Sequence, residues 1–403
     1  MNHPNIHRSL IVIILIVFAT IFLAGCTQPA TVPQPVRDTI QNLPSATVSA
    51  DLQKILSTGT EKSGFCGIQA EISTPQWTWD SAAGNASRSP TVKAEPGMRF
   101  IAASVTKVFT SVAIQKLAEE GKLSLDDPID RWLPVDVSQR IPNSSVITIH
   151  QLLDHTSGIA DYNEMEIVFR ENEKPDIPIP YQDGMDASLR AGPLYPPGAG
   201  YTYSNVNYIL LTLIIDKAAN DPYEDYVTRT IFVPAGMNET FIQHTNHIPG
   251  PHMAAQEAQA NGTLIDFTNR YLQFDRGAGD IITTTADLNR FHRALRTGKL
   301  IGPASLAAME KTSPQSHKII KSYGFGDMTD GYGLGYQTQT NATAKVTLQG
   351  HNGGYPGSST FMMYWPEQDT YITLNINSIA NVETAYPNIL VPVVGYLGNK
   401  TSG

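Results

Sequence analysis

A serine and a lysine three residues apart stand in a segment whose other side chains are apolar or small. Ser104 and Lys107 lie within residues 100–109, and Lys107 is the only charged residue between Arg99 and Lys116. Residues three apart share one face of a helix, so the amine would lie beside the hydroxyl. A buried lysine that loses its charge can take the proton of a serine and activate it as a nucleophile. The pair is therefore a candidate activated nucleophile; the alternative is a chance match, because a two-residue pattern such as Ser-x-x-Lys occurs about once by chance in a chain of this length.

Residues 104–120 have the pattern of a helix that is apolar on nearly all sides, and Gly121 ends it. The apolar positions are Val105, Val108, Phe109, Val112, Ala113, Ile114, Leu117 and Ala118. A helix of this kind is buried in a globular protein. An ammonium group there is costly unless it is paired, which argues against a purely structural lysine. Backbone N–H groups at the helix start are also free to stabilise an oxyanion.

Tyr203 and Asn205 follow in a loop rich in Gly and Pro, residues 196–205, directly before an apolar helix predicted over 206–215. A tyrosine hydroxyl held near a lysine loses its proton more readily and can act as a base. The asparagine amide offers both a donor and an acceptor. The two residues are therefore candidate partners of the Ser-Lys pair.

His351 lies in the sequence Gly-His-Asn-Gly-Gly, which closes a strand predicted over 344–351. Gly353 and Gly354 would let a ligand or another part of the backbone approach the strand edge closely. The imidazole could donate a hydrogen bond to a bound group or adjust the charge of a pocket. This stretch is the third candidate element of the site.

Strand patterns at both ends of the chain, with helical patterns between them, predict an α+β fold. The predicted strands cover residues 64–73, 76–83, 344–351, 359–365 and 370–377, of which the last three form an antiparallel meander. Residues 125–300 carry helical patterns broken by Pro and Gly loops. We expect one antiparallel sheet formed from N- and C-terminal strands, flanked by helices, with an inserted and mainly helical lobe.

The first residues have the pattern of a targeting segment. An apolar run over 10–25, too short for a comfortable membrane span, ends in Leu-Ala-Gly-Cys, which resembles the lipobox of prokaryotic lipoproteins. We expect a signal peptide over 1–25, a lipid-anchored Pro- and Thr-rich tether over 26–47 that begins at an acylated Cys26, and a folded domain over 48–398. An uncleaved signal anchor is the alternative. Both place the domain at the cell membrane, on the extracytoplasmic side.

The overall composition limits the partners. The formal net charge is −9 and the Lys and Arg residues are scattered, which argues against a nucleic-acid partner. Charged residues make up 16% and apolar residues 41% of the chain, so a sizeable buried core can form.

Three short motifs, in their order and separations, resemble those of the serine β-lactamase and penicillin-recognising superfamily. They are Ser104-x-x-Lys107, Tyr203-x-Asn205 and His351-x-Gly353. The similarity is to its class C branch, which contains DD-carboxypeptidases, class C β-lactamases and related esterases. Further similar stretches lie at 152–159, 234–240, 277–288 and 331–335. The resemblance implies a β-lactamase/DD-peptidase-like fold and a serine hydrolase that needs neither a metal nor another cofactor.

The resemblance also implies roles for the site residues. It assigns catalysis to Ser104, Lys107, Tyr203 and His351 and substrate binding to Asn205, Gly353 and Gly354. Ser104 would attack a carbonyl and pass its proton to Lys107 and Tyr203. Backbone N–H groups of Ser104 and Gly354 would hold the oxyanion. Tyr203, assisted by His351, would protonate the leaving group and later activate water.

The substrate class is less sharply indicated than the chemistry. A histidine at 351 in place of lysine, together with Tyr203-Ser204-Asn205, favours a D-alanyl-D-alanine carboxypeptidase-like peptidase. Some relatives carry an arginine after the Tyr-Gly-x-Gly stretch to bind a terminal carboxylate, whereas Tyr336 and Gln337 stand here. The alternatives are a class C-like β-lactamase, a β-lactamase-fold carboxylesterase, and a penicillin- or peptide-binding sensor that does not turn over. The expected partners are therefore a small-molecule or peptide substrate, and the membrane through Cys26.

Overall fold

The structure is a computed structural model in which strands from both ends of the chain meet in one sheet. It describes residues 42–162, 166–167, 170, 173–174, 176–258, 263–322, 326–378 and 382–401, all within the unit Thr39–Gly403. The strands are β1 (Gly67–Ser73), β2 (Thr78–Arg88), β3 (Thr91–Lys93), β4 (Phe100–Ile101), β5 (Phe241–Ile242), β6 (Gln256–Ala258), β7 (Leu264–Asp266), β8 (Ile281–Thr283), β9 (Lys318–Ser322), β10 (Gly326–Tyr332), β11 (Gln337–Asn341), β12 (Val346–Tyr355), β13 (Ser358–Trp365) and β14 (Thr370–Ile376). The α-helices are α1 (Ala46–Ser63), α2 (Thr106–Glu119), α3 (Val135–Ser138), α4 (Ile149–Leu153), α6 (Tyr181–Ala191), α7 (Asn205–Ala219), α8 (Tyr223–Val227), α9 (Val233–Ala235), α10 (Thr285–Arg296), α11 (Pro303–Glu310), α12 (Val382–Ala385) and α13 (Val391–Thr401). Short 3-10 or π turns include η1 (Ala103–Val105), η4 (Gln273–Asp275) and η7 (Tyr386–Leu390).

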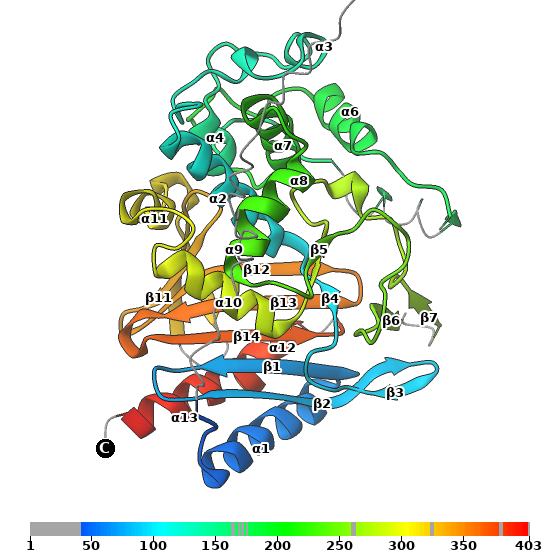
Figure 1. Cartoon of the computed structure of the whole chain (residues 1–403), viewed down its shortest axis with the longest axis vertical. Helices are drawn as coiled ribbons and strands as arrows, with labels where there is room; N and C mark the ends of the chain where they lie inside the picture. The colour runs from blue at the N-terminus through cyan, green and yellow to red at the C-terminus, as the bar shows by residue number, and fades with distance from the viewer. Residues whose placement is uncertain are drawn as a thin grey trace, which may run out of the picture. The chain divides into compact units, whose positions relative to one another are not determined.

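A nine-stranded sheet has the order β3-β2-β1-β14-β13-β12-β11-β10-β9 (Figure 1). Its β1 pairs antiparallel with β14, in a register that sets Ile68 opposite Ile376. Strands from the two ends of the chain are thus direct neighbours, and the helical lobe is inserted between them in sequence. The predicted α+β architecture, with one antiparallel sheet and an inserted helical lobe, is confirmed.

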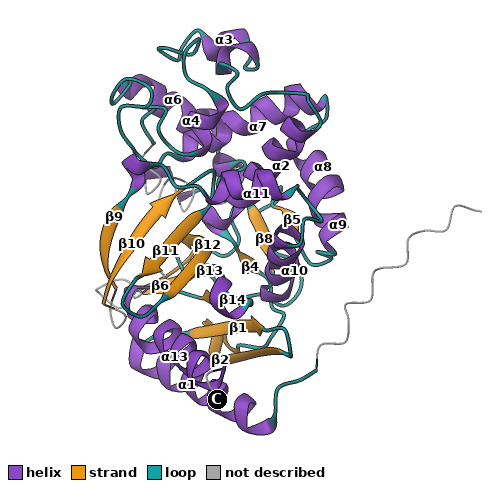
Figure 2. Ribbon diagram, turned by 90° about the vertical axis from the view of Figure 1, so that its left-hand side faces the viewer, coloured by secondary structure: helices purple, strands orange, loops and turns teal. Residues whose placement is uncertain are grey.

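Alternation along β1 divides the side chains between the two faces of the sheet. Ile68, Ala70 and Ile72 belong to a hydrophobic core that is completed by α1 and α13 (Figure 2). Glu71 points to the opposite face, where Asn289 of α10 donates a hydrogen bond to its Oε1 at 3.1 Å. The sheet therefore separates this core from a second and larger core that continues into the helical lobe.

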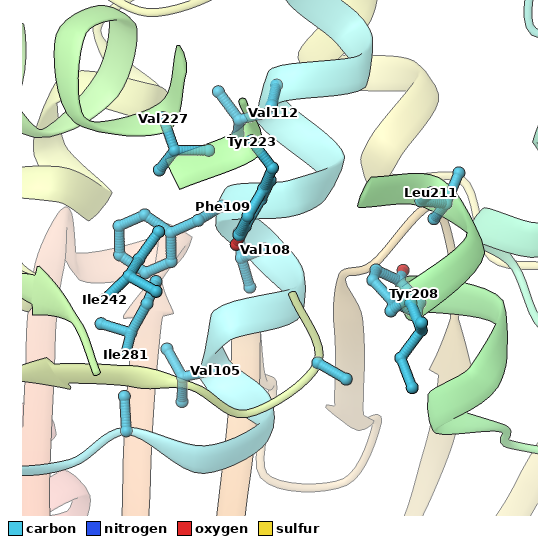
Figure 3. Close-up of a cluster of buried hydrophobic side chains, with 14 of the residues drawn as sticks. Val105, Val108, Phe109, Val112, Tyr208, Leu211, Tyr223, Val227, Ile242 and Ile281 are labelled. Atoms are coloured by element: carbon cyan, nitrogen blue, oxygen red, sulfur yellow. The ribbon is translucent and has the colours of Figure 1, made fainter. Parts of the chain in front are cut away.

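Helix α2 runs through the larger core, as its apolar sequence predicts. Every residue from Phe100 to Gln115 except Ser104 is buried. The aromatic ring of Phe109 stacks on that of Phe291 with a centroid distance of 3.8 Å. Figure 3 shows the side chains of α2 surrounded by those of α7, α8, β5 and β8, which include Tyr208, Leu211, Tyr223, Val227, Ile242 and Ile281.

The expected strands are found, with one difference at the glycine-rich stretch. β12 continues as far as Tyr355, so Gly353 and Gly354 lie within the strand rather than in a loop that follows it. The pairing explains this difference, because Gly353 and Gly354 stand opposite Thr360 and Ser359 of β13 in an unbroken ladder. Hydrogen bonds to β13 hold the glycines in an extended conformation that their own preferences would not select.

The folded part begins earlier than residue 48. Ser45 caps α1 by accepting the Val48 N–H at 3.3 Å, and Asn42 forms a bridge with Trp77. The end of the predicted tether is therefore part of the first helix. The predicted signal peptide and Cys26 lie outside the described residues. None of the helices in the described ranges has the length and hydrophobicity needed to cross a bilayer.

Candidate active site

The turn that carries Ser104 is fixed before α2 begins. β4 pairs with β8, and the Ala102 N–H donates to the Ile281 carbonyl at 2.9 Å. Ala103 then adopts a φ of +50°, which is unfavourable for a residue with a Cβ. Ser104 leaves this turn only partly buried, while its neighbours on both sides are anchored in the core. The turn thus presents one hydroxyl from an otherwise buried segment.

Lys107 is completely buried, and its amine lies within hydrogen-bond distance of three oxygen atoms. Nζ is 2.7 Å from Asn205 Oδ1, 2.9 Å from the Ala278 carbonyl oxygen and 3.3 Å from Ser104 Oγ. Amide and carbonyl oxygens can only accept, so these two take N–H bonds of the amine. A neutral amine that uses both of its N–H bonds in this way has its lone pair left to accept from the Ser104 hydroxyl. This geometry suits transfer of the serine proton to Lys107.

The loop that supplies the Ala278 carbonyl is tied to α2. Thr110 Oγ1 donates to the Gly277 carbonyl at 2.7 Å, and the Ile281 N–H donates to Thr106 Oγ1 at 3.3 Å. The two threonines lie on either side of Lys107 along the helix. The position of the loop relative to the lysine is therefore set by α2 itself.

Asn205 is the first residue of α7, and its amide is held by Asp161. The Asn205 backbone N–H donates to Asp161 Oδ1 at 2.9 Å, and Nδ2 donates to Oδ2 at 3.3 Å. Ser204 makes no side-chain cap, and the Asp161 carboxylate instead accepts the first backbone N–H of α7 from another segment. Burial raises the pKa of Asp161 to about 6; Lys107 opposes this rise and Asp275 adds to it.

Tyr203 contacts both Lys107 and a buried histidine, His155. Lys107 Nζ is 4.8 Å from the centroid of the Tyr203 ring, and the centroid of the His155 ring is 4.4 Å from it. The Ser204 N–H donates to His155 Nδ1 at 3.2 Å, so the imidazole hydrogen is on Nε2. Burial, with the charge of Lys107, holds the pKa of His155 well below its usual value. His155 is thus a neutral surface against which Tyr203 packs.

His351 is buried on β12, and both of its ring nitrogens have partners. Nδ1 is 2.6 Å from the Asn352 carbonyl oxygen, which can only accept, so Nδ1 carries the hydrogen. Nε2 then accepts from the Tyr332 hydroxyl at 2.9 Å. Burial, together with Lys107, lowers the pKa of His351 to about 3, so the ring is neutral at neutral pH. In this geometry both ring nitrogens are engaged and the ring holds Tyr332 in place. The expected assistance of His351 to Tyr203 stays a prediction.

Gly353 brings β12 against the serine turn. A Cβ atom at this position would lie 2.1 Å from the carbonyl oxygen of Ala102, so any larger residue would push the strand and the turn apart. Gly354, the next residue, is exposed. Its expected role as the second oxyanion donor stays a prediction.

The structure brings the predicted residues together. Hydrogen bonds connect Ser104, Lys107 and Asn205, the Tyr203 ring lies against the lysine, and the rings of Tyr203 and His351 are 6.4 Å apart. Sequence reasoning gave no role to Asp161, His155 or Tyr332, although the last two lie in stretches already noted as similar to the family. Within the described ranges, no group of three or more His, Cys, Asp or Glu side chains is placed to hold a metal ion.

Comparison with known proteins gives the family. A sequence model of the Beta-lactamase family matches residues 52–390, so the chain belongs to the beta-lactamase family of serine hydrolases. Penicillin-binding protein 4* of Bacillus subtilis is 32% identical over 338 residues, which are 80% of this chain and 71% of that protein. Protein flp of Staphylococcus aureus is 29% identical over 301 residues, 74% of this chain but only 56% of that protein.

Solved structures show the same fold. A D-stereospecific amidohydrolase from Streptomyces sp. matches with a TM-score of 0.72 and 26% identity, over 84% of this chain and 98% of that one. A penicillin binding protein from Bacillus halodurans matches with a TM-score of 0.68 and 24% identity, over 83% of this chain and 96% of that one. The predicted β-lactamase/DD-peptidase-like fold is thereby confirmed.

Proposed function

We propose that the protein hydrolyses amide bonds next to D-amino acids through an acyl-enzyme on Ser104, as a D-alanyl-D-alanine carboxypeptidase-like peptidase. The observation that carries the proposal is the position of Lys107 Nζ. It lies 2.7 Å and 2.9 Å from two oxygens that can only accept, and 3.3 Å from Ser104 Oγ. Such an arrangement activates a serine without a histidine base.

In acylation, the Ser104 O–H bond breaks, the proton passes to Lys107 Nζ, and Oγ forms a bond to the substrate carbonyl carbon. The carbonyl electron pair moves to oxygen, and the backbone N–H groups of Ser104 and Gly354 stabilise the oxyanion. When the intermediate collapses, the C–N bond breaks. The departing nitrogen takes a proton through Tyr203, whose ring lies against Lys107.

In deacylation, water replaces the departed amine. Its oxygen attacks the ester carbon while one proton passes through Tyr203 to Lys107. The Oγ–C bond then breaks, and Lys107 returns the proton to Ser104 Oγ. We expect His351 to contribute through Tyr332 and not as the proton donor, because its Nδ1 hydrogen is engaged with a carbonyl and its Nε2 accepts from Tyr332.

The substrate preference follows from the residues after the Tyr-Gly-Leu-Gly turn. Some relatives have an arginine after this turn, whereas Tyr336 and Gln337 follow it here. Gln337 accepts the Asn352 N–H at 3.1 Å and so stabilises β12. With a neutral side chain committed to the sheet, we expect little selection for a free C-terminal carboxylate. The Streptomyces structure, named as a D-stereospecific amidohydrolase, supports a D-configured amide as the substrate class.

The test is a substrate panel on the protein from residue 42 onward. It contains a D-Ala-D-Ala peptide, the same peptide with an amidated C-terminus, a chromogenic cephalosporin and short p-nitrophenyl esters. We expect both peptides to be cleaved, with an acyl group on Ser104 in intact-mass spectra. Ser104→Ala should abolish turnover and acylation, while Ser57→Ala on α1, behind the sheet, should change neither.

The alternatives are separate outcomes of the same panel. Faster turnover of the cephalosporin than of the peptides would identify a class C-like β-lactamase, and turnover of esters alone a carboxylesterase. Acylation of Ser104 without release would identify a penicillin- or peptide-binding sensor. Unchanged hydrolysis in Ser104→Ala would overturn the mechanism at its centre.

We also propose that Cys26 is acylated and anchors the domain to the cell membrane. The lipobox-like sequence Leu-Ala-Gly-Cys supports this. Detergent-phase partitioning of the full chain should be lost in Cys26→Ser; partitioning that persists in this variant would indicate an uncleaved signal anchor instead.

A further inference from the structure

We propose that Asp161 is a positioning residue. It determines which end of the Asn205 side-chain amide, the oxygen or the NH2 group, faces Lys107. The inference rests on the proposed function, since it concerns the lysine that activates Ser104. It also extends that function to a residue outside the three motifs.

The contacts define the direction of the amide. Asp161 Oδ2 accepts from Asn205 Nδ2 at 3.3 Å, and Asp161 Oδ1 accepts from the Asn205 backbone N–H at 2.9 Å. At the other end of the same amide, Asn205 Oδ1 accepts from Lys107 Nζ at 2.7 Å. Asp161, Asn205 and Lys107 thus form a connected line of hydrogen bonds that ends at Ser104 Oγ.

The shape of the amide does not select this direction, because its oxygen and NH2 group are nearly the same size. The selection comes from the hydrogen-bond partners. A carboxylate only accepts and therefore attracts the NH2 group, which leaves the oxygen for the lysine. If the side-chain amide rotated by 180°, its NH2 group would face the amine of Lys107. The lysine would then lose one of the two acceptors that orient it toward Ser104.

The surroundings of Asp161 make its charge sensitive to pH. The charged groups that act on it are Lys107 of α2 and Asp275 of η4, while α7 contributes its N-terminal N–H group. Asp275 is itself buried and accepts from Tyr162 at 2.8 Å. Burial raises the pKa of Asp161 to about 6. Below this pH the carboxyl group gains a hydrogen, can donate, and no longer selects the NH2 group.

The variant Asp161→Asn tests the inference because it keeps the shape and removes the charge. With the best substrate of the panel, we expect kcat to fall about 10- to 100-fold, as for a misplaced catalytic group, with KM changed about threefold or less. The acid limb of the kcat profile near pH 6 should disappear. Wild-type kcat with an unchanged acid limb would overturn the inference.

Two further experiments show whether a loss of kcat in Asp161→Asn comes from the lost orientation of Asn205, from the lost charge, or from impaired folding. Asp275→Asn removes the neighbouring carboxylate, which accepts a hydrogen bond from Tyr162, and should retain most of kcat. In an Asn205→Ala background, Asp161→Asn should have little further effect, since the amide to be oriented is absent. Equal losses in both backgrounds, or a loss of kcat that only follows a lower melting temperature, would assign Asp161 a structural role and overturn the inference.

A readout without turnover keeps this test independent of the proposed function. The side-chain amide signals of Asn205 in ¹⁵N-labelled protein should shift with a midpoint near pH 6 and should be insensitive to this pH in Asp161→Asn. This result would support the inference even if no compound of the panel acylated Ser104. Amide signals that ignore pH in the wild-type protein would overturn it.

Discussion

Two buried histidines near Ser104 carry their single hydrogen on opposite nitrogens. His351 has it on Nδ1, because a carbonyl oxygen faces that atom, and His155 has it on Nε2, because a backbone N–H points at its Nδ1. Each ring is therefore locked by one backbone group. Neutral rings of fixed tautomer shape the site without adding a positive charge beside Lys107.

This assignment predicts the magnetic resonance spectrum of the two rings. In long-range ¹H–¹⁵N spectra of histidine-labelled protein at neutral pH, we expect one neutral Nδ1–H ring and one neutral Nε2–H ring. The Nδ1–H ring, His351, should not titrate between pH 5 and 8. The reason is that burial lowers the pKa of His351 to about 3 and that of His155 well below its usual value. The variants His351→Gln and His155→Gln assign the signals. A doubly protonated His351 above pH 5 would contradict the structure.

Helices and strands could be predicted from the sequence where their apolar residues recur with the regular spacing of a buried helix or strand. The alternation in β1 and β14 and the apolar circumference of α2 identify these elements because burial selects the residue types. The strands β9 to β11 were not predicted. β11, whose sequence is Gln-Thr-Gln-Thr-Asn, has no apolar alternation, and its strand conformation comes from its neighbours in the sheet.

The site shows the same limit. Ser104 and Lys107 could be predicted because they are only three residues apart, Ser104 in the turn η1 and Lys107 in the first turn of α2. Asp161 could not, since its partner Asn205 is 44 positions away, and neither periodicity nor composition indicates which distant side chains meet. The role of Tyr332 could not be predicted for the same reason, although its hydroxyl contacts His351 directly.

The contact between β1 and α10 predicts how stability depends on pH. Burial raises the pKa of Glu71 from 4.5 to about 7, with the hydrogen bond from Asn289 opposing the rise. The pKa of Glu71 is higher in the folded state than in the unfolded state. The stability that the protonated Glu71 contributes is therefore fully present below pH 4.5 and is lost as the pH rises through 7. The loss is about 3 kcal/mol at most, because one pKa unit corresponds to about 1.4 kcal/mol.

Glu71→Gln keeps the acceptor for Asn289 and removes the ionisable proton. Urea unfolding should therefore give a higher free energy of unfolding than wild type at pH 8 and a similar value at pH 4.5. Glu61→Gln is the control, since it removes an exposed carboxylate of α1 that is not among the groups acting on Glu71. If the difference between Glu71→Gln and wild type were independent of pH, the buried carboxyl would not be its cause.

For the molecule as a whole, two cores on opposite faces of one sheet separate stability from catalysis. Leu56 of α1 belongs to the core behind the sheet, and Leu211 of α7 belongs to the core that contains α2. Either residue changed to alanine should cost about 2–5 kcal/mol of folding free energy. Leu56→Ala should leave the kcat of the folded protein unchanged. Leu211→Ala should also lower kcat severalfold, because α7 carries Asn205 at its N-terminus.

The measurement compares urea midpoints with kcat corrected for the fraction of acylatable Ser104. An equal loss of kcat in the two variants would mean that the sheet transmits packing defects from one core to the other.

The pairing of β1 with β14 also dictates an order of events in synthesis. The Gly67 N–H donates to Asn377 Oδ1 across 310 positions of the chain, and contacts of such length close late in folding. A nascent chain cannot form the ladder between these strands until nearly all of it has been made. β14 lies inside the sheet, between β1 and β13. A premature stop before residue 370 therefore removes a strand from inside the sheet. Early termination leaves separate pieces of three and five strands and no partly working enzyme.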